Sequence, residues 1–321
     1  MTQATPPPEF PALAQWTPAI ALGIYEDVGE RAVAGDVTGR LVIPEDLVGT
    51  ATLVLKAPGV VSGLPAIEPI CRMFDARLDV DWPTRPAGEA TFFPEASSAS
   101  PVELLTIRGP VRSLLAAERT LLNLLGHLGG VATLTHEFVK RKEGTRAIIL
   151  DTRKTTPGLR HLEKYAVLCG GGRNHRIGLH DMVLVKDNHL ALAGIAGGEA
   201  LTEAVRKLVR DSRAEDPGRG VEVEVDTLEQ FERVLAVDGV DIILLDNMDL
   251  ETLSKCVALR DEAASRPGRK VEPMLEASGG VTLETVGDIA RTGVERISVG
   301  AITHSAPSLD LSLDVKASSL G

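Results

Sequence analysis

Short apolar runs separated by helical stretches recur through the second half of the chain. The runs predict strands at Ala147–Leu150, Met182–Val185, Val221–Val225, Ile242–Leu245, Met274–Leu275 and Arg296–Val299. The segments between them carry apolar residues at helical spacing, as in Leu201–Val209, Leu228–Leu235, Leu250–Ala264 and Leu283–Arg291. Six βα units in succession indicate a parallel sheet. We expect an α/β fold with an open, incomplete (β/α) barrel of about six parallel strands, and a doubly wound sheet is the alternative.

The first third of the chain mixes strand and helix patterns. It predicts strands at Thr52–Ala57, Arg77–Val80 and Glu103–Arg108 and a helix at Ala66–Ala76. A long helix with a broad leucine stripe begins near Val111, and Gly129 and Gly130 predict a bend or a close packing contact in it. We therefore expect an N-terminal α/β domain over residues 1–125, with the Pro-rich residues 1–18 as a loose arm, followed by the barrel over residues 126–300.

Composition and charge restrict the functional class. Aromatic residues make up only 3% of the chain, which predicts an aliphatic core and argues against a base-stacking surface. A net charge of −11 argues against nucleic acid or an anionic membrane as a partner. The three cysteines include no CxxC pair, and no run of about 18 apolar residues occurs. We expect a cytoplasmic protein.

Polar residues or glycines follow every predicted strand of the barrel. They are Asp151, Arg153 and Lys154, then Lys186, then Glu224, then Asp246, then Ser278, Gly279 and Gly280, and finally Gly300 and Ala301. Ligands of parallel α/β folds bind where the carboxyl ends of the strands meet. The pattern therefore predicts that these residues converge on one site.

A local excess of cations lies between residues 151 and 189, in an otherwise acidic protein. Seven lysines and arginines stand there against four acids, and the set includes Arg153, Lys154, Arg176 and Lys186. Arginine offers paired donors to carboxylates and phosphates, and lysine offers a mobile charge. The segment predicts a site for a small, strongly anionic ligand, and a set of solvated surface ion pairs is the alternative.

Two glycine turns on neighbouring strands predict a phosphate site. Ser278, Gly279 and Gly280 are expected to present backbone N–H groups to an anion at the start of a helix, and Gly300 and Ala301 offer a second such turn. Ordinary tight turns are the alternative reading.

Carboxylates end two central strands. Glu222 and Glu224 alternate with valines, so both point to one face, where Glu222 is expected to form a structural ion pair. Glu224 and Asp246 are better placed to bind ribose hydroxyls or a divalent ion. Walker, GxSxG and HExxH motifs are absent, and the spacing of His175 and His180 does not suit zinc.

Several motifs together resemble the quinolinate phosphoribosyltransferase family. They are DTRKTTPGLR from Asp151, KYA from Lys164, GGGRNHR ending at Arg176, VKDNH ending at His189, ERTLLN from Glu118, VEVEVD, LLDN, EASGG and VGAITHS. The resemblance runs from about residue 20 to 315. It implies an N-terminal α/β sandwich, an open α/β barrel, and a C-terminal tail, residues 301–321, that packs back on the first domain. It also implies a homodimer or larger homo-oligomer with shared active sites.

The implied reaction joins quinolinate to 5-phosphoribosyl 1-pyrophosphate, with Mg²⁺, and releases pyrophosphate and CO2. By motif position, Arg119, Arg153, His175, Arg176 and Lys186 resemble the quinolinate-binding residues. Residues resembling the phosphoribosyl pyrophosphate site are Arg119, Lys154, Glu224, Asp246, Ser278, Gly279, Gly280, Gly300 and Ala301. Lys154, Lys186, Glu224 and Asp246 resemble catalytic residues, and Glu224 and Asp246 also lie near the metal, directly or through the substrate.

Three alternatives remain open at this point. One is a related enzyme acting on another heteroaromatic acid, the second a barrel isomerase that binds a sugar phosphate, and the third a non-catalytic anion sensor. The doubled basic set argues against the isomerase because it suits two anionic ligands at once, and the complete set of site residues argues against the sensor.

Overall fold

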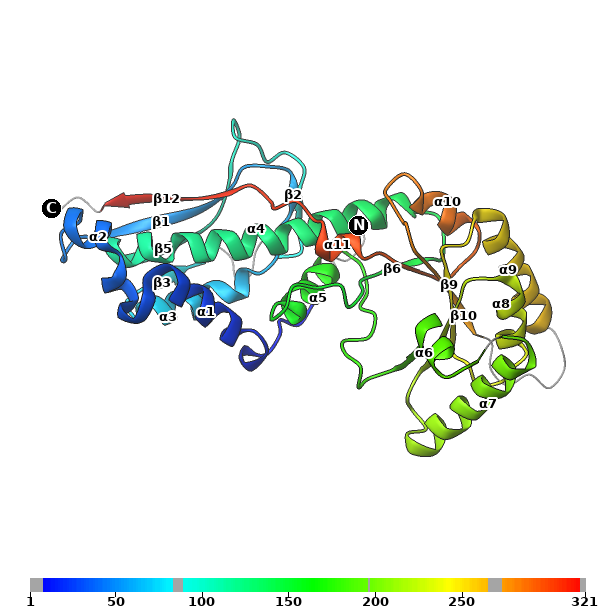
Figure 1. Cartoon of the computed structure of the whole chain (residues 1–321). Coiled ribbons are helices and arrows are strands. Elements are labelled where there is room, and N and C mark those ends of the chain that lie inside the picture. The colour runs from blue at the N-terminus through cyan, green and yellow to red at the C-terminus, as the bar shows by residue number, and fades with distance from the viewer. Residues whose placement is uncertain (1–7, 83–88, 196, 265–272, 318–321) are drawn as a thin grey trace. The chain divides into compact units, whose positions relative to one another are not determined.

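The chain folds into two compact units. The structure is a computed structural model that describes residues 8–82, 89–195, 197–264 and 273–317 (Figure 1). The first unit contains the described residues up to 136, together with 155–171 and 302–317, and the second contains 137–154 and 172–301. The division therefore falls inside the long helix α4 (Val111–Arg141), whereas the sequence placed it at residues 125 and 126.

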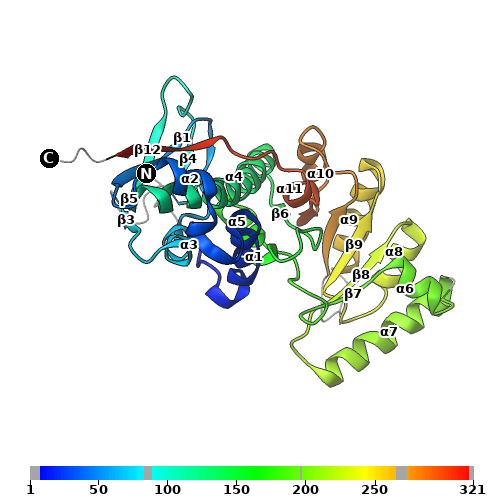
Figure 2. The same cartoon turned by 60° about the vertical axis from the view of Figure 1, so that its left-hand side comes forward.

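An antiparallel sheet with the order β12-β1-β5-β3 forms the centre of the first unit. Its strands are β1 (Val48–Leu55), β3 (Asp79–Asp81), β5 (Val102–Pro110) and β12 (Leu311–Ala317). Leu53 pairs with Leu105 on one side and Leu313 on the other, and all three are buried. Strand β12 from the C-terminal tail thus lies beside β1, as Figures 1 and 2 show. A further strand pair joins β2 (Gly59–Val60) to β4 (Phe92–Phe93).

Helices complete the first unit. They are η1 (Leu13–Gln15), α1 (Thr17–Val28), η2 (Gly29–Gly35), α2 (Val37–Val42), η3 (Leu64–Ala66), α3 (Ile67–Phe74), most of α4, and α5 (Arg160–Cys169). The leucine stripe that predicted α4 is buried: Leu114, Leu121, Leu125 and Leu128 are each at most 3% exposed.

The prediction of a loose arm over residues 1–18 is wrong for its described part. Trp16 is 1% exposed, and the ring of Phe10 stacks edge-on against both Trp16 and Tyr165 of α5. The burial of Trp16 and the ring contacts of Phe10 hold this Pro-rich segment in place, because large aromatic side chains bury much apolar surface. Residues 1–7 lie outside the described residues.

The second unit contains a six-stranded parallel sheet with the order β6-β11-β10-β9-β8-β7. The strands are β6 (Ile148–Leu150), β7 (Val183–Val185), β8 (Val221–Val225), β9 (Ile242–Asp246), β10 (Met274–Ser278) and β11 (Arg296–Ser298). The sheet is open and the order of β7 to β11 does not reverse, which confirms the incomplete barrel and excludes the doubly wound alternative.

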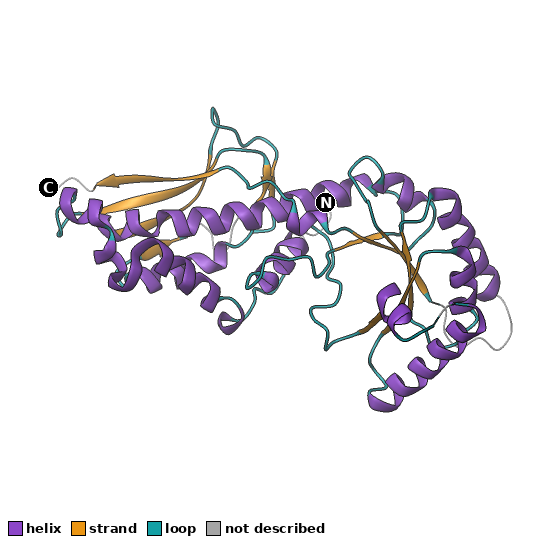
Figure 3. Ribbon diagram, in the orientation of Figure 1, coloured by secondary structure: helices purple, strands orange, loops and turns teal. Residues whose placement is uncertain are grey.

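The two faces of this sheet differ in chemistry. The layer of helices α7 (Gly198–Glu215), α8 (Leu228–Leu235), α9 (Leu250–Ala264) and α10 (Val286–Arg291) lies along one face (Figure 3). Strand residues Val223, Ile243 and Ile297 have no exposed surface and belong to the apolar face. Glu222, Glu224 and Glu276 alternate with such residues and so point to the other face. The short helices α6 (Asp187–Leu192) and α11 (Ala301–His304) follow β7 and β11.

The paired glycines of α4 permit a close backbone approach. A Cβ at Gly130 would clash with the carbonyl oxygen of Pro307, and one at Gly129 would lie 2.7 Å from Leu309 Cδ2. The Leu309 N–H donates to the Gly126 carbonyl at 2.8 Å. The glycines therefore allow the segment that leads into β12 to pack directly on the helix.

All three cysteines are free and buried in the described structure. Burial is the main cause that raises the pKa of Cys71, Cys169 and Cys256 to about 12. Among the described helices, none combines the length and the apolar composition required to cross a bilayer.

Two glycine-to-alanine substitutions in helices should have opposite effects. Gly130→Ala forces the Pro307 backbone away and should lower the unfolding free energy by about 1–3 kcal/mol. Gly23→Ala in α1 meets nothing within 4 Å and should raise it by up to about 1 kcal/mol through helix propensity. Thermal unfolding of both variants tests this, and equal midpoints would contradict the close approach.

Candidate active site

The carboxyl edge of the parallel sheet collects ten of the predicted site residues. Arg153 and Lys154 follow β6, Lys186 follows β7, and Glu224 and Asp246 lie at the ends of β8 and β9. The glycine turns complete the edge, with Ser278, Gly279 and Gly280 at the end of β10 and Gly300 and Ala301 after β11. Because the strands are parallel and neighbours in one sheet, these groups lie along one edge rather than on separate surfaces.

An ion pair joins the ends of β7 and β8. The Lys186 ammonium contacts Glu224 Oε2, and the Glu224 side chain is only 11% exposed. On the next strand, Asp246 Oδ2 accepts a hydrogen bond from Asn247 Nδ2 at 2.8 Å. The register pairs Glu224 with Leu244, so Glu224 and Asp246 point to the same face of the sheet. One amine and two carboxylates thus share the β7 side of the edge.

The positive charge of Arg153, which follows β6, acts on Arg176. Burial is the first cause that lowers the pKa of Arg176, and the positive charge of Arg153 adds to it, while Glu222, Asp181 and Glu224 oppose it. The Arg176 guanidinium donates from Nη1 to the Met182 carbonyl at 3.2 Å. Like charges held together in a partly buried place are typical of anion-binding sites.

The turn after β10 requires glycine. Gly279 has φ +93°, and a Cβ there would overlap the side-chain amide of Asn247. The Asn247 N–H in turn donates to the Ser278 carbonyl at 2.9 Å. Helix α10, however, begins only at Val286, so the prediction that Gly279 and Gly280 open a helix is wrong. The intervening residues form a loop, and an anion here can use loop amides but not a helix terminus.

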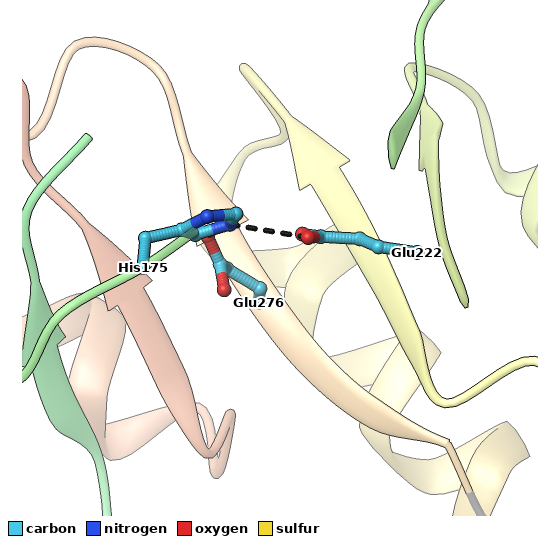
Figure 4. A group of neighbouring side chains, drawn as sticks. All are labelled: His175, Glu222 and Glu276. Carbon is cyan, nitrogen blue, oxygen red and sulfur yellow. Dashed lines mark ion pairs between the residues drawn. The ribbon is translucent and has the colours of Figure 1, made fainter. Parts of the chain in front are cut away.

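Beneath the edge, His175 lies between two buried carboxylates (Figure 4). Its Nε2 is 3.1 Å from Glu222 Oε2 and 3.4 Å from Glu276 Oε1. Glu276 Oε2 also accepts from Arg296 Nε at 2.6 Å. The ion pair of Glu222 that the sequence favoured is present. Histidine with two carboxylates can bind a metal, but here the Arg296 guanidinium already supplies a cation to Glu276.

The ionisation of this cluster follows from opposing influences. Burial favours the neutral imidazole, but Glu222 and Glu276 outweigh it and raise the pKa of His175 to about 9. The Arg176 N–H, which contacts Nδ1 at 2.7 Å, also favours a ring without a proton on that atom. Burial raises the pKa of Glu222, whereas His175 and Arg296 overcome burial and lower the pKa of Glu276.

His175 and Arg176 belong to a segment tied to β6. Arg173 bridges to Leu150, and the His175 N–H donates to Asp151 Oδ1 at 2.9 Å. The side chain of His175 is only 7% exposed, so its Nε2 faces protein carboxylates. Its predicted contact with a substrate carboxylate stays a prediction.

Sequence reasoning placed Asp151 at the site without a specific role and assigned none to Glu276 or Arg296, although each is part of this buried layer. The available signal was the alternation of acidic and apolar residues along the strands. In the sheet, Glu276 and Glu224 both pair with Leu244, so Glu276 shares a face with Glu222 and Glu224. Arg119 lies in the first unit, on α4, with its side chain 70% exposed and 3.5 Å from Glu118. Its role in a neighbouring subunit's site stays a prediction.

Stability of the second unit should depend on the ionisation of His175. Its folded pKa of about 9 exceeds the ordinary value of 6.5, so the contribution is complete below about pH 6.5 and is lost as the pH rises through 9. The gap in unfolding free energy between wild type and His175→Gln should narrow by on the order of 3 kcal/mol from pH 6.5 to 10. Denaturant titrations measure it, with exposed His180→Gln as control; a constant gap would refute the ionisation.

Comparison with known proteins identifies the family. The sequence profile of "Quinolinate phosphoribosyl transferase, N-terminal domain" matches residues 36–129, and that of the C-terminal domain matches residues 131–314. The chain is 40% identical to a Mycobacterium leprae protein named nicotinate-nucleotide pyrophosphorylase [carboxylating], over 87% of this chain and 91% of that one. It is 38% identical to a chloroplastic protein of the same name from Arabidopsis thaliana, over 92% and 81% of the two chains.

Solved structures agree with the sequence comparison. The nicotinate-nucleotide pyrophosphorylase of Francisella tularensis superposes with a TM-score of 0.81 at 34% identity, covering 97% of this chain and all of that one. The Ehrlichia chaffeensis protein of the same name gives 0.79 at 32% identity, covering 94% and 98%. These findings confirm the resemblance inferred from the motifs and exclude the sugar-phosphate isomerase. With both of its domain profiles matched, this chain belongs to the quinolinate phosphoribosyltransferase family.

Proposed function

We propose that the protein joins quinolinate to 5-phosphoribosyl 1-pyrophosphate and forms nicotinate mononucleotide, pyrophosphate and CO2, a step of NAD biosynthesis. The observation that carries the proposal is the composition of one sheet edge. Arg153 follows β6, and its charge acts on Arg176. Lys186, Glu224 and Asp246 occupy the side of β7, β8 and β9, and the glycine turns after β10 and β11 lie between β6 and β9. Such a set suits two anionic ligands bound together.

Each part of the edge suits one part of the substrates. The paired arginines are proposed to bind the two carboxylates of quinolinate, because guanidinium groups form forked hydrogen bonds with carboxylates. The turn at Ser278, Gly279 and Gly280 is proposed to bind the 5-phosphate through backbone N–H groups, together with Gly300 and Ala301. Glu224 and Asp246 face the same side and are proposed to accept hydrogen bonds from the ribose hydroxyls.

The proposed chemistry needs no nucleophile from the enzyme. The pyridine nitrogen forms a bond to the anomeric carbon as the bond to pyrophosphate breaks, and pyrophosphate leaves with the electron pair. Lys154 and Lys186 stabilise the charge on the leaving group, and Glu224 and Asp246 stabilise the positive charge that develops on the sugar. The bond to the 2-carboxyl group then breaks. CO2 leaves, and the ring carbon retains the electron pair and takes up a proton from solvent.

A magnesium ion is proposed to enter with the pyrophosphate. Glu224 and Asp246 supply the hard oxygen donors that Mg²⁺ prefers, but Glu224 is already paired with Lys186. Two carboxylates, one of them partly neutralised, fit an ion held chiefly by the substrate. When bound, the ion would neutralise charge on the leaving pyrophosphate.

We also propose a cytoplasmic homo-oligomer. Three free, buried cysteines are consistent with a reducing compartment. Arg119 is proposed to act in the site of a partner subunit, since its side chain is exposed and the carboxylate that it pairs with in the described structure is that of the adjacent Glu118, at 3.5 Å.

A substrate panel tests the activity. The purified protein with Mg²⁺ and phosphoribosyl pyrophosphate should release CO2 and pyrophosphate from quinolinate, and form no nucleotide from nicotinate or nicotinamide. Chelation with EDTA should abolish product formation, and added Mg²⁺ should restore it. Turnover of a different heteroaromatic acid in place of quinolinate would assign the protein to a related activity, and no turnover with any acid would favour an anion sensor.

Removal of either catalytic lysine should slow turnover strongly. A charge-stabilising donor contributes roughly 3–4 kcal/mol to transition states of this kind, so Lys154→Ala and Lys186→Ala should each lower kcat at least about a hundredfold. Lys207→Ala is the matched control, because Lys207 lies on α7 in an exposed pair with Asp211. Near-normal kcat in both lysine variants would remove them from the mechanism.

A further inference from the structure

Glu276 is a fully buried carboxylate to which the proposed reaction gives no role. It lies on β10, two residues before Ser278, with no exposed side-chain surface. Burial of an ionised carboxylate costs several kcal/mol unless cations and hydrogen bonds offset it. The chain offsets that cost with the Arg296 guanidinium and the His175 imidazole, and this arrangement indicates a specific task.

Glu276 connects strand β11 to the segment that carries Arg176. Its Oε2 accepts from Arg296 Nε at 2.6 Å, and its Oε1 lies 3.4 Å from His175 Nε2. Glu222 on β8 lies 3.1 Å from the same nitrogen, so the imidazole contacts carboxylates from both β8 and β10 (Figure 4). Both carboxylates face Nε2, which therefore carries a proton in either ionisation state of the ring.

The imidazole passes this constraint to Arg176. The N–H of Arg176 contacts His175 Nδ1 at 2.7 Å, and the N–H of His175 donates to Asp151 at 2.9 Å. Asp151 has no exposed surface and directly follows β6. A ring held at Nε2 thus fixes the backbone from which the Arg176 side chain extends.

Arg176 needs such support because Arg153 repels it. The positive charge of Arg153 opposes the attraction of Arg176 to Glu222, Asp181 and Glu224, and the Arg176 side chain donates to the Met182 carbonyl at 3.2 Å. Repulsion between the two positive charges favours their separation, so a backbone that restrains Arg176 helps to keep them together. The buried layer below provides that restraint.

We propose that Glu276 is a positioning residue that holds Arg176, through His175, in the geometry that binds the diacid substrate. The proposal rests on the proposed function, since it takes Arg176 to bind a carboxylate of quinolinate. Glu276 itself touches no substrate. It sets the affinity for the pyridine diacid and leaves phosphoribosyl pyrophosphate largely unaffected.

Glu276→Gln separates positioning from a simple charge effect by the sign of the change. Loss of a buried negative charge makes the edge more positive, so a purely electrostatic role would lower KM for the diacid. Positioning predicts the reverse, a rise in KM for quinolinate of at least about tenfold, with KM for phosphoribosyl pyrophosphate and kcat within about threefold of wild type. Glu276→Asp, which keeps the charge on a shorter side chain, should recover part of the loss.

Glu295→Gln is the matched control. Glu295 immediately precedes β11 and pairs with the buried Arg260 at 2.9 Å, at the opposite edge of the sheet. It should lower thermal stability and leave both KM values unchanged. CO2 release by the wild-type protein tests the proposed function. The ratio of variant KM to wild-type KM tests the positioning role of Glu276.

An unchanged or lower KM for quinolinate in Glu276→Gln would overturn the proposal, as would equal rises in both KM values. If Glu276→Gln does not fold, Arg296→Lys provides the second test. It keeps the cation and loses the Nε contact, so it should raise KM for quinolinate selectively; an unchanged KM in this variant would also overturn the proposal.

Discussion

The architecture of the site depends on how buried carboxylates are compensated beneath a row of cations. Glu222 and Glu276 have no exposed surface, and they contact the His175 imidazole and the Arg296 guanidinium. Without these cations the acids would oppose folding, and without the acids the cations above would repel each other unrestrained. The charged groups on the polar face of the sheet therefore stabilise one another only when all of them are present. Charged and apolar residues alternate along strands β8 and β10 for this reason.

The open parallel sheet makes such a set possible. One face is sealed by a single layer of helices over valine and isoleucine, so each strand can devote alternate positions to charge. The carboxyl ends then present residues from six strands in a row, each fixed by a backbone that belongs to the sheet or directly follows it. Under the proposed function, guanidinium groups and glycine turns at different places along this row select two anions of different shape.

Much of this could be predicted from the sequence because the strands have strong local signals. The apolar runs at Val221–Val225 and Ile242–Leu245 coincide with β8 and β9, and the polar residues after them do lie at one edge. Contacts between distant segments had no such signal. Phe10 packs on Tyr165, and α5 joins the first unit although it follows β6, because burial of aromatic and aliphatic side chains decides both. The role of Glu276 required the register between β9 and β10, which a single strand does not reveal. The late start of α10 was missed because glycine followed by a helical pattern does not give the length of the loop between them.

The burial of the three cysteines determines how the protein responds to oxidants and to thiol-labelling reagents. A thiol reacts with oxidants, alkylating agents and heavy metals as its thiolate, and burial keeps Cys71, Cys169 and Cys256 protonated at neutral pH. The neighbouring Glu89 carboxylate raises the pKa of Cys169 as well and so disfavours its thiolate further. The folded protein therefore offers peroxide or maleimide little to attack, and thiol labelling becomes a sensitive reporter of its unfolding rather than of its surface.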